Sequence, residues 1–106
     1  MIRVSLYENS VGIYAVKVKN HGDPIVCAAV SMLVINTANA IGALTGAKID
    51  CKVDESKAYI AFELPEVKAG LANHDAGLLL AALKLGLESA AKEYPKDIKI
   101  KKGISQ

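Results

Sequence analysis

Hydrophobic and polar residues alternate along the first 19 positions of the chain, which predicts a pair of β-strands. Ile2, Val4 and Leu6 alternate with polar or aromatic residues, and this is the period of a half-buried strand. A short turn that contains Gly12 follows, and residues 13–19 then resume the alternation. Two such runs joined by a turn of this composition predict a β-hairpin.

The stretch after the hairpin is mostly apolar and predicts a long helix from Pro24 to about Leu44. Asp23 is a favourable N-cap, and Pro24 suits the first helical position because proline lacks the N–H that would be unpaired there. Gly46 lies where a left-handed residue commonly ends a helix. Because the first turns are apolar on nearly every side, we expect a central helix that is buried on several faces and touches a second subunit.

The next part of the chain predicts another hairpin and another helix. Residues 48–54 and 57–64 alternate again on either side of a short polar connection. The helix that follows ends at Tyr94, because the proline after it disfavours helical backbone angles in the preceding residue. Asn73 or Asp75 is the expected N-cap of this second helix.

The last stretch completes the predicted fold. Ile98 and Ile100 alternate with lysines and predict a final strand. The resulting order is ββαββαβ, so the predicted fold class is α+β: a two-layer sandwich in which two helices cover a mostly antiparallel sheet. A chain of 106 residues is close to the commonest size of one domain, so we expect a single compact unit over residues 1–106.

The composition narrows the classes of function. With 52% hydrophobic and 23% charged residues the sequence is ordinary for a globular protein, and its net charge of +2 does not predict a strong polyanion binder. Direct nucleic-acid binding is therefore not expected. The sequence shows no signal-peptide stretch and no apolar run judged long enough for a membrane span, so we expect a cytoplasmic protein, away from membranes, with reduced thiols.

One histidine and one cysteine lie six positions apart across the predicted helix start, and they form the candidate catalytic pair. Cys27 falls in the first helical turn, where unpaired N–H groups and the positive end of the helix dipole favour a thiolate. His21 lies in the entry loop, from which its ring can return over that turn. Asp23 can either cap the helix or orient the His21 ring. The alternative is an inert buried cysteine beside a solvated histidine.

The same segment supplies candidates for oxyanion and substrate binding. The backbone of the first turn, at Val26 and Ala28, can receive the oxyanion that forms when a thiolate attacks a carbonyl. Gly22 is expected to take the backbone angles of a tight reversal. Ser31 lies one turn after Cys27 on the same face, where its hydroxyl either meets the thiolate or substrate or bonds back to a helix carbonyl.

Other chemically capable residues have simpler interpretations. Cys51 is expected to be structural, and His74 is expected to belong to the start of the second helix rather than to a catalytic site. The histidines and cysteines show none of the paired spacings of zinc sites, so no metal is expected. A basic C-terminal run either attracts an acidic or RNA-rich partner or forms a solvated strand face that protects a sheet edge. It consists of Lys96, Lys99, Lys101 and Lys102.

Residues 21–31 read HGDPIVCAAVS, and this segment resembles the hallmark of the ribosomal-processing cysteine protease family, Prp. In that family a histidine loop is followed by a helix that begins Ile-Val-Cys-Ala-Ala-Val-Ser. The likeness continues through Asn36 and Asn39, the second hairpin and the stretch LKLGLESAAKEYPKDIKI, so it covers essentially the whole chain. The family histidine usually lies in Gly-His-Ala, often with a longer loop before the cysteine than this chain has.

The resemblance implies a cysteine endopeptidase that removes an N-terminal extension from ribosomal protein twenty-seven of the large subunit, cutting after a pair of phenylalanines. By motif position it implies Cys27 as the nucleophile and His21 as the base. It also implies a homodimer, a histidine loop that orders over the substrate, and a reaction without a cofactor. The alternative function is a non-catalytic α+β module that binds ribosomal components through the basic C-terminal strand.

Overall fold

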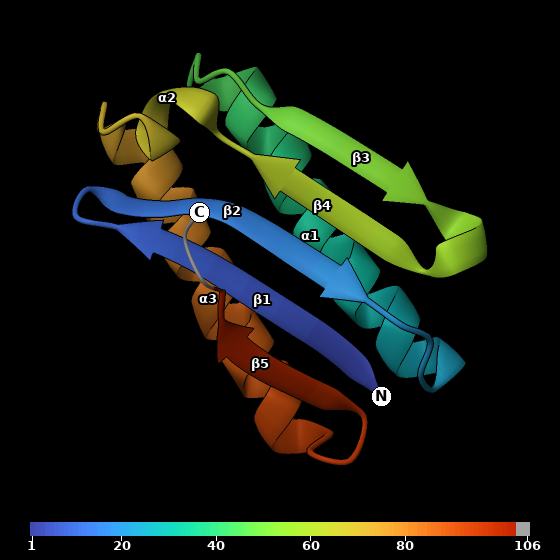
Figure 1. The fold of residues 1–106 in the computed structure, drawn as a ribbon. Coiled ribbons are helices and arrows are strands. Elements are labelled where there is room, and N and C mark those ends of the chain that lie inside the picture. The colour runs from blue at the N-terminus through green and yellow to red at the C-terminus, as the bar shows by residue number, and fades with distance from the viewer. Residues whose placement is uncertain (104–106) are drawn as a thin grey trace.

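A computed structural model describes residues 1–103 of the chain, and it has the predicted ββαββαβ order with two short additions (Figure 1). The additions are a single helical turn after the second hairpin and a 3-10 turn inside that hairpin. In chain order the elements are β1 (Ile2–Asn9), β2 (Gly12–Lys19), α1 (Pro24–Leu44), β3 (Asp50–Asp54), η1 (Glu55–Lys57), β4 (Tyr59–Glu63), α2 (Pro65–Lys68), α3 (His74–Glu93) and β5 (Ile98–Lys102).

The five strands form one sheet in the order β3-β4-β2-β1-β5. The pairs β1–β2, β2–β4 and β3–β4 are antiparallel, whereas β5 runs parallel to β1. The parallel pair follows from the long α3 connection, which carries the chain back past the sheet before β5 begins. The predicted fold class, a mostly antiparallel sheet covered by two helices, is confirmed.

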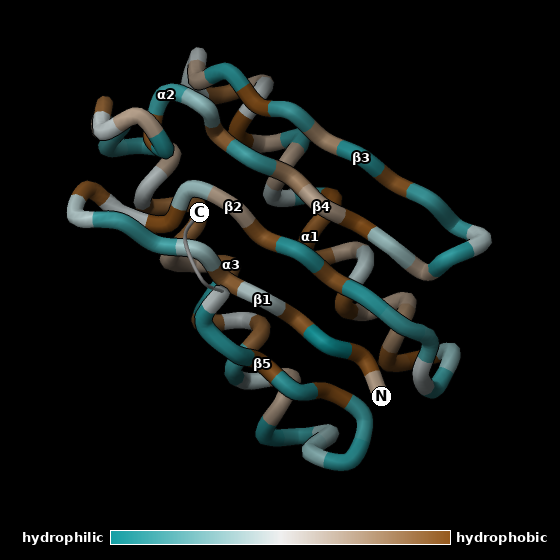
Figure 2. Tube along the Cα trace, viewed as in Figure 1, coloured by the Kyte–Doolittle hydropathy of each residue, from teal (hydrophilic) through white to brown (hydrophobic). Residues whose placement is uncertain are grey.

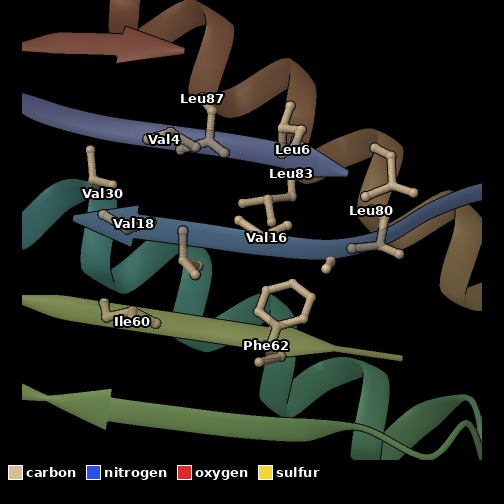
Figure 3. Close-up of a cluster of buried hydrophobic side chains, with 14 of the residues drawn as sticks. Val4, Leu6, Val16, Val18, Val30, Ile60, Phe62, Leu80, Leu83 and Leu87 are labelled. Carbon is tan, nitrogen blue, oxygen red and sulfur yellow. The ribbon is translucent and has the colours of Figure 1, made fainter. Parts of the chain in front are cut away.

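Both long helices, α1 and α3, pack against the same face of the sheet. The hydrophobic core therefore lies in one layer between the helices and the sheet (Figures 1 and 3). β1, β2 and β4 contribute alternate side chains to this layer, as the alternation predicts, whereas the edge strand β3 contributes no buried side chain. Each fully buried Val or Leu contributes about 1.5–3 kcal/mol through removal of apolar surface from water. The helical part of the core consists of Val26, Val30, Val34, Ala38, Ile41, Ala76, Leu80, Leu83 and Leu87.

The predicted helix boundaries are confirmed by their cap geometry. Asp23 is the N-cap of α1, and its Oδ1 accepts hydrogen bonds from the N–H groups of Ile25 at 3.0 Å and Val26 at 3.3 Å. Gly46 follows the end of α1 in a left-handed conformation, with φ of 70°. At the start of α3 the Asn73 side chain accepts from the N–H of Ala76. These three signals in the sequence therefore mark both ends of α1 and the start of α3.

The expectation that no apolar run is long enough for a membrane span is wrong. Among residues 1–103, α1 is long and apolar enough by length and composition. The reason is that its polar residues are all uncharged, and Asn, Thr and Ser interrupt the run only weakly. In this structure one face of α1 lies in the protein core, while its outer face leaves Ile25 and Met32 more than 70% exposed. No other segment among residues 1–103 buries these two apolar side chains of α1.

Candidate active site

The loop between β2 and α1 reverses at Asn20, not at Gly22 as expected. Asn20 adopts a left-handed conformation with φ of 76°, which asparagine tolerates better than most residues. Gly22 is required for a different reason, because a Cβ at this position would lie 2.8 Å from Cγ1 of the buried Ile2. The absence of a side chain at Gly22 lets the histidine loop pack directly on β1.

Gly22→Ala is expected to destabilise the protein by about 1–3 kcal/mol, because the new methyl group must displace a packed core side chain. Thermal or urea unfolding measures the loss. Gly77→Ala is the matched control: a Cβ there meets no atom within 4 Å, and alanine favours the interior of α3. A Gly22→Ala variant as stable as the wild type would show that the loop does not need this close contact.

Cys27 and His21, the predicted pair, line one and the same cavity, with a volume of about 210 Å³. Cys27 lies in the first turn of α1 and is half-buried, so its sulfur is neither sealed in the core nor fully solvated. His21 lies in the exposed entry loop at the mouth of the cavity. The fold therefore brings a thiol and an imidazole to one solvent-accessible space, and no hydrogen bond joins Cys27 and His21 within residues 1–103. Nucleophilic catalysis requires the two groups to come within hydrogen-bond reach once substrate is bound.

Part of the cavity wall comes from the strands, which the sequence interpretation did not assign to the site. The apolar part is formed by β-strand residues and by the inner side of α1, and it consists of Ile2, Val18, Val30, Ile35, Val53 and Ile60. Their only signal in the sequence is the spacing of apolar residues on strands and on α1, which also includes the exposed Val53. Nothing local marks which core positions border a cavity, because that depends on how the β3–β4 hairpin lies beside α1.

Asp23 performs only one of its two predicted roles, because its carboxylate caps α1. Its Oδ1 holds the N–H groups of Ile25 and Val26, while its carbonyl accepts from the N–H of Cys27 at 2.8 Å. The first-turn N–H groups are therefore occupied in this structure, whereas the sequence interpretation expected them to be free for an oxyanion. The Val26 bond is the longer of the two bonds to the side chain.

Ser31 differs from the other hydroxyl residues on the helices. Thr37, Thr45 and Ser89 each donate to the carbonyl four residues before, as hydroxyls inside helices often do. The Ser31 hydroxyl makes no such bond to any residue between 1 and 103, and Ser31 lines the cavity with Cys27. The position of the Ser31 hydroxyl therefore favours contact with the thiolate or substrate over a hydrogen bond to a helix carbonyl.

The far end of the cavity is acidic. Asp54 and Glu55 line it where β3 turns into η1. A hydrogen bond from the Ser56 hydroxyl to Oδ1 of Asp54, at 2.7 Å, lowers the pKa of the Asp54 carboxyl. The carboxylate is therefore ionised at neutral pH, and it places a negative charge at one end of an otherwise apolar space.

The remaining candidates lie outside this cavity. Cys51 is exposed on the edge strand β3, and His74 is exposed in the first turn of α3, where its ring contacts the Asp75 carboxylate at 3.3 Å. No group of three or more potential metal ligands occurs within residues 1–103. Neither residue contributes to the site that contains Cys27.

Comparison with known proteins points to one protein family, both by sequence and by three-dimensional structure. The family described as cysteine protease Prp matches residues 1–99. The ribosomal processing cysteine protease Prp of Bacillus subtilis (strain 168) is 30% identical over 84 residues, which make up 79% of this chain and 75% of that protein.

Two solved structures share the whole fold. The ribosomal processing protease Prp from S. aureus, in complex with a covalently linked product peptide, superposes with a TM-score of 0.86 at 25% identity and covers 97% of this chain and 100% of that one. SMU.848 from Streptococcus mutans has a TM-score of 0.84 at 26% identity and covers 96% and 93%. Together with the family match, these similarities show that the chain belongs to the cysteine protease Prp family and is a cysteine-type peptidase.

Proposed function

We propose that this protein is an endopeptidase that removes an N-terminal extension from ribosomal protein twenty-seven of the large subunit, with Cys27 as nucleophile and His21 as base. The observation that carries this proposal is the shared cavity, into which α1 brings the thiol and the preceding loop brings the imidazole. The names of the B. subtilis and S. aureus relatives, both ribosomal processing proteases, support the class of substrate.

The reaction is acyl transfer to water through a thioester. His21 takes the proton of the Cys27 thiol, and the sulfur attacks the peptide carbonyl. The carbon–nitrogen bond then breaks, and His21 gives that proton to the leaving amine. His21 then removes a proton from water, the hydroxide attacks the thioester carbonyl, and the thiolate leaves. No cofactor is needed for any of these steps.

The oxyanion of the tetrahedral intermediate needs a hydrogen-bond donor, and we infer that the Val26 N–H supplies it. This group makes the weaker bond to the Asp23 cap, at 3.3 Å, so it can be exchanged at small cost. Ala28 lies deeper in α1, where its N–H belongs to the regular helical pattern. Val26 is therefore the stronger candidate of the two predicted donors.

The apolar cavity wall suits the aromatic residues that precede the proposed cleavage site. The apolar part of the wall is mainly aliphatic, and Ser31 lines the same cavity as Cys27. A pair of phenylalanines would bury a large apolar area there, whereas small or charged residues would not. The substrate preference therefore depends on residues from strands as well as from α1.

The proposed function is tested by the mass of the products. The protein is incubated with the extended ribosomal protein and, as a control, with the same substrate carrying two alanines in place of the phenylalanine pair. We expect a single cut directly after the pair in the first substrate and none in the control. An extended protein that stays at full mass would contradict the assigned activity, and equal cutting of both substrates would contradict the assigned specificity.

We also propose a homodimer formed through the outer helix face, defined as Ile25, Met32, Leu33, Leu78 and Leu85. These exposed apolar side chains lie on α1 and α3, which pack beside each other. A contiguous apolar surface on a monomer marks an interaction site, and a second copy brings an identical surface to cover it. We further propose that the protein acts in the cytoplasm, where its free cysteines stay reduced.

Met32→Lys is expected to weaken self-association by about tenfold or more, because it buries a charge at the centre of an apolar interface. Light scattering after size-exclusion chromatography, or sedimentation over a range of concentrations, measures this change. Val53→Lys, which adds the same charge at an exposed position of the edge strand β3, is the control and should leave association unchanged. A wild-type protein that stays monomeric at high concentration would exclude the dimer.

A further inference from the structure

The face of the sheet opposite the helices carries two rows of positive charge. The register places Arg3 directly between Lys99 on β5 and Lys19 on β2. One step along the strands, Ser5 lies between Lys101 and Lys17 in the same way. Directly paired residues point to the same side of a sheet, and the neighbours Val4 and Val18 point into the core. We call the five cationic residues, Arg3, Lys17, Lys19, Lys99 and Lys101, the basic sheet face.

These charges are not neutralised within the protein. Between residues 1 and 103, none of the five makes an ion pair with a carboxylate, and the only aromatic contact is that of Lys17 Nζ over the Tyr7 ring at 5.3 Å. The carboxylates that do pair with lysine, Glu63 and Glu8, bind Lys68 and Lys84 instead. Four of the five cationic side chains are exposed, and Lys17 is half-buried.

The charge distribution is uneven over the whole molecule. The chain holds 13 Lys and Arg and 11 Asp and Glu. Five of the cations lie on the basic sheet face, so eight cations and 11 carboxylates remain elsewhere. A net charge of +2 therefore hides a positive area over β1, β2 and β5. On the same side of the sheet, over β4 and β3, the register places Glu63 and Asp50 beside Lys52. In Figure 2 hydrophilic segments of β1, β2 and β5 lie next to one another on this face.

Like charges placed directly opposite each other destabilise a sheet. The row of Lys99, Arg3 and Lys19 therefore lowers the stability of the fold, whereas Ser5 separates Lys101 from Lys17 in the second row. A polyanion with closely spaced charges would relieve this repulsion. An extended set of cations on neighbouring strands suits a phosphate backbone better than a single acidic side chain.

We propose that the basic sheet face binds the phosphate backbone of RNA, without sequence specificity. The choice of RNA over other polyanions rests on the proposed function, because a ribosomal protein substrate lies beside ribosomal RNA. The cavity with Cys27 is on the helix side of the sheet, so RNA and a peptide can be bound at the same time. Such binding would hold the enzyme close to its substrate.

The test measures the affinity for a fluorescent oligouridylate by anisotropy at several salt concentrations. Five phosphate contacts on a single strand predict a slope of log Kobs against log salt of about −3 to −4. Lys99→Gln/Lys101→Gln is expected to weaken binding several-fold and to make this slope shallower by about 1–2. The matched control, Lys48→Gln/Lys92→Gln, removes the same charge from other surfaces and should change neither quantity.

Two more readouts separate this proposal from its rivals. Lys99→Gln/Lys101→Gln should melt at a higher temperature than the wild type at low salt and should cleave a short peptide substrate at the wild-type rate. A polyglutamate peptide that binds as tightly as oligouridylate would overturn the choice of RNA, and equal losses in both double variants would overturn the assigned face. Absence of peptide cleavage with intact RNA binding would contradict the proposed function alone.

Discussion

Replacing Cys27 by alanine is expected to lower kcat/KM for cleavage of the extended ribosomal protein by about 10⁴-fold or more, because the variant cannot form the thioester. Alanine leaves α1 intact, since Cys27 is half-buried and alanine is a good helix former. Substrate binding should survive, because the apolar wall of the cavity is unchanged. Intact-mass analysis of the substrate over time measures the rate, and the circular dichroism spectrum checks the fold.

Cys51→Ala is the matched control for this prediction. Cys51 is the other free cysteine of the chain, and it is exposed on β3 outside the cavity that holds Cys27. Its replacement should leave kcat/KM at the wild-type value. A Cys27→Ala variant that still cuts the substrate, or a Cys51→Ala variant that does not, would move the nucleophile to another residue.

Replacing His21 by alanine is expected to lower kcat by about 10²–10⁴-fold, the usual contribution of a positioned general acid and base. KM should change little, because His21 lies at the exposed mouth of the cavity rather than in its apolar wall. Steady-state kinetics with a peptide that spans the cleavage site separates the two parameters. The thioester should also form more slowly in single-turnover experiments.

His74→Ala provides the comparison, because His74 is the second histidine of the chain and is exposed at the start of α3, where its ring contacts Asp75. It should retain the wild-type kcat. If His21→Ala raised KM and left kcat unchanged, His21 would be a substrate-binding residue, and another group would have to serve as the base. The two histidine variants therefore decide whether His21 acts as the general base or only binds substrate.

The elements with strong local signals could be predicted closely from the sequence. Asp23 and Pro24 mark the start of α1, Gly46 follows its end, and Asn73 caps α3. These residues act within one turn of the backbone, so their effect does not depend on the rest of the fold. The alternation of the strands likewise identified the core face, because a strand with one buried face has only one compatible pattern.

Features that depend on how distant segments meet could not be predicted. The role of Gly22 depends on the buried Ile2, which lies 20 residues earlier and packs beneath the loop. The two cationic rows arise only when β5 pairs with β1, because Lys99 and Lys101 then join Arg3 and the lysines of β2. Charge counted along the chain contains no information on this register.

The position of β1 inside the sheet has a consequence for synthesis on the ribosome. β1 is made first, yet it lies between β2 and β5. The hairpin of β1 and β2 can form early, but one edge of β1 stays unpaired until residues 98–102 have emerged. During that interval the growing chain exposes an unpaired strand edge that is prone to wrong pairing. The sheet reaches its final strand order only when β5 pairs with β1.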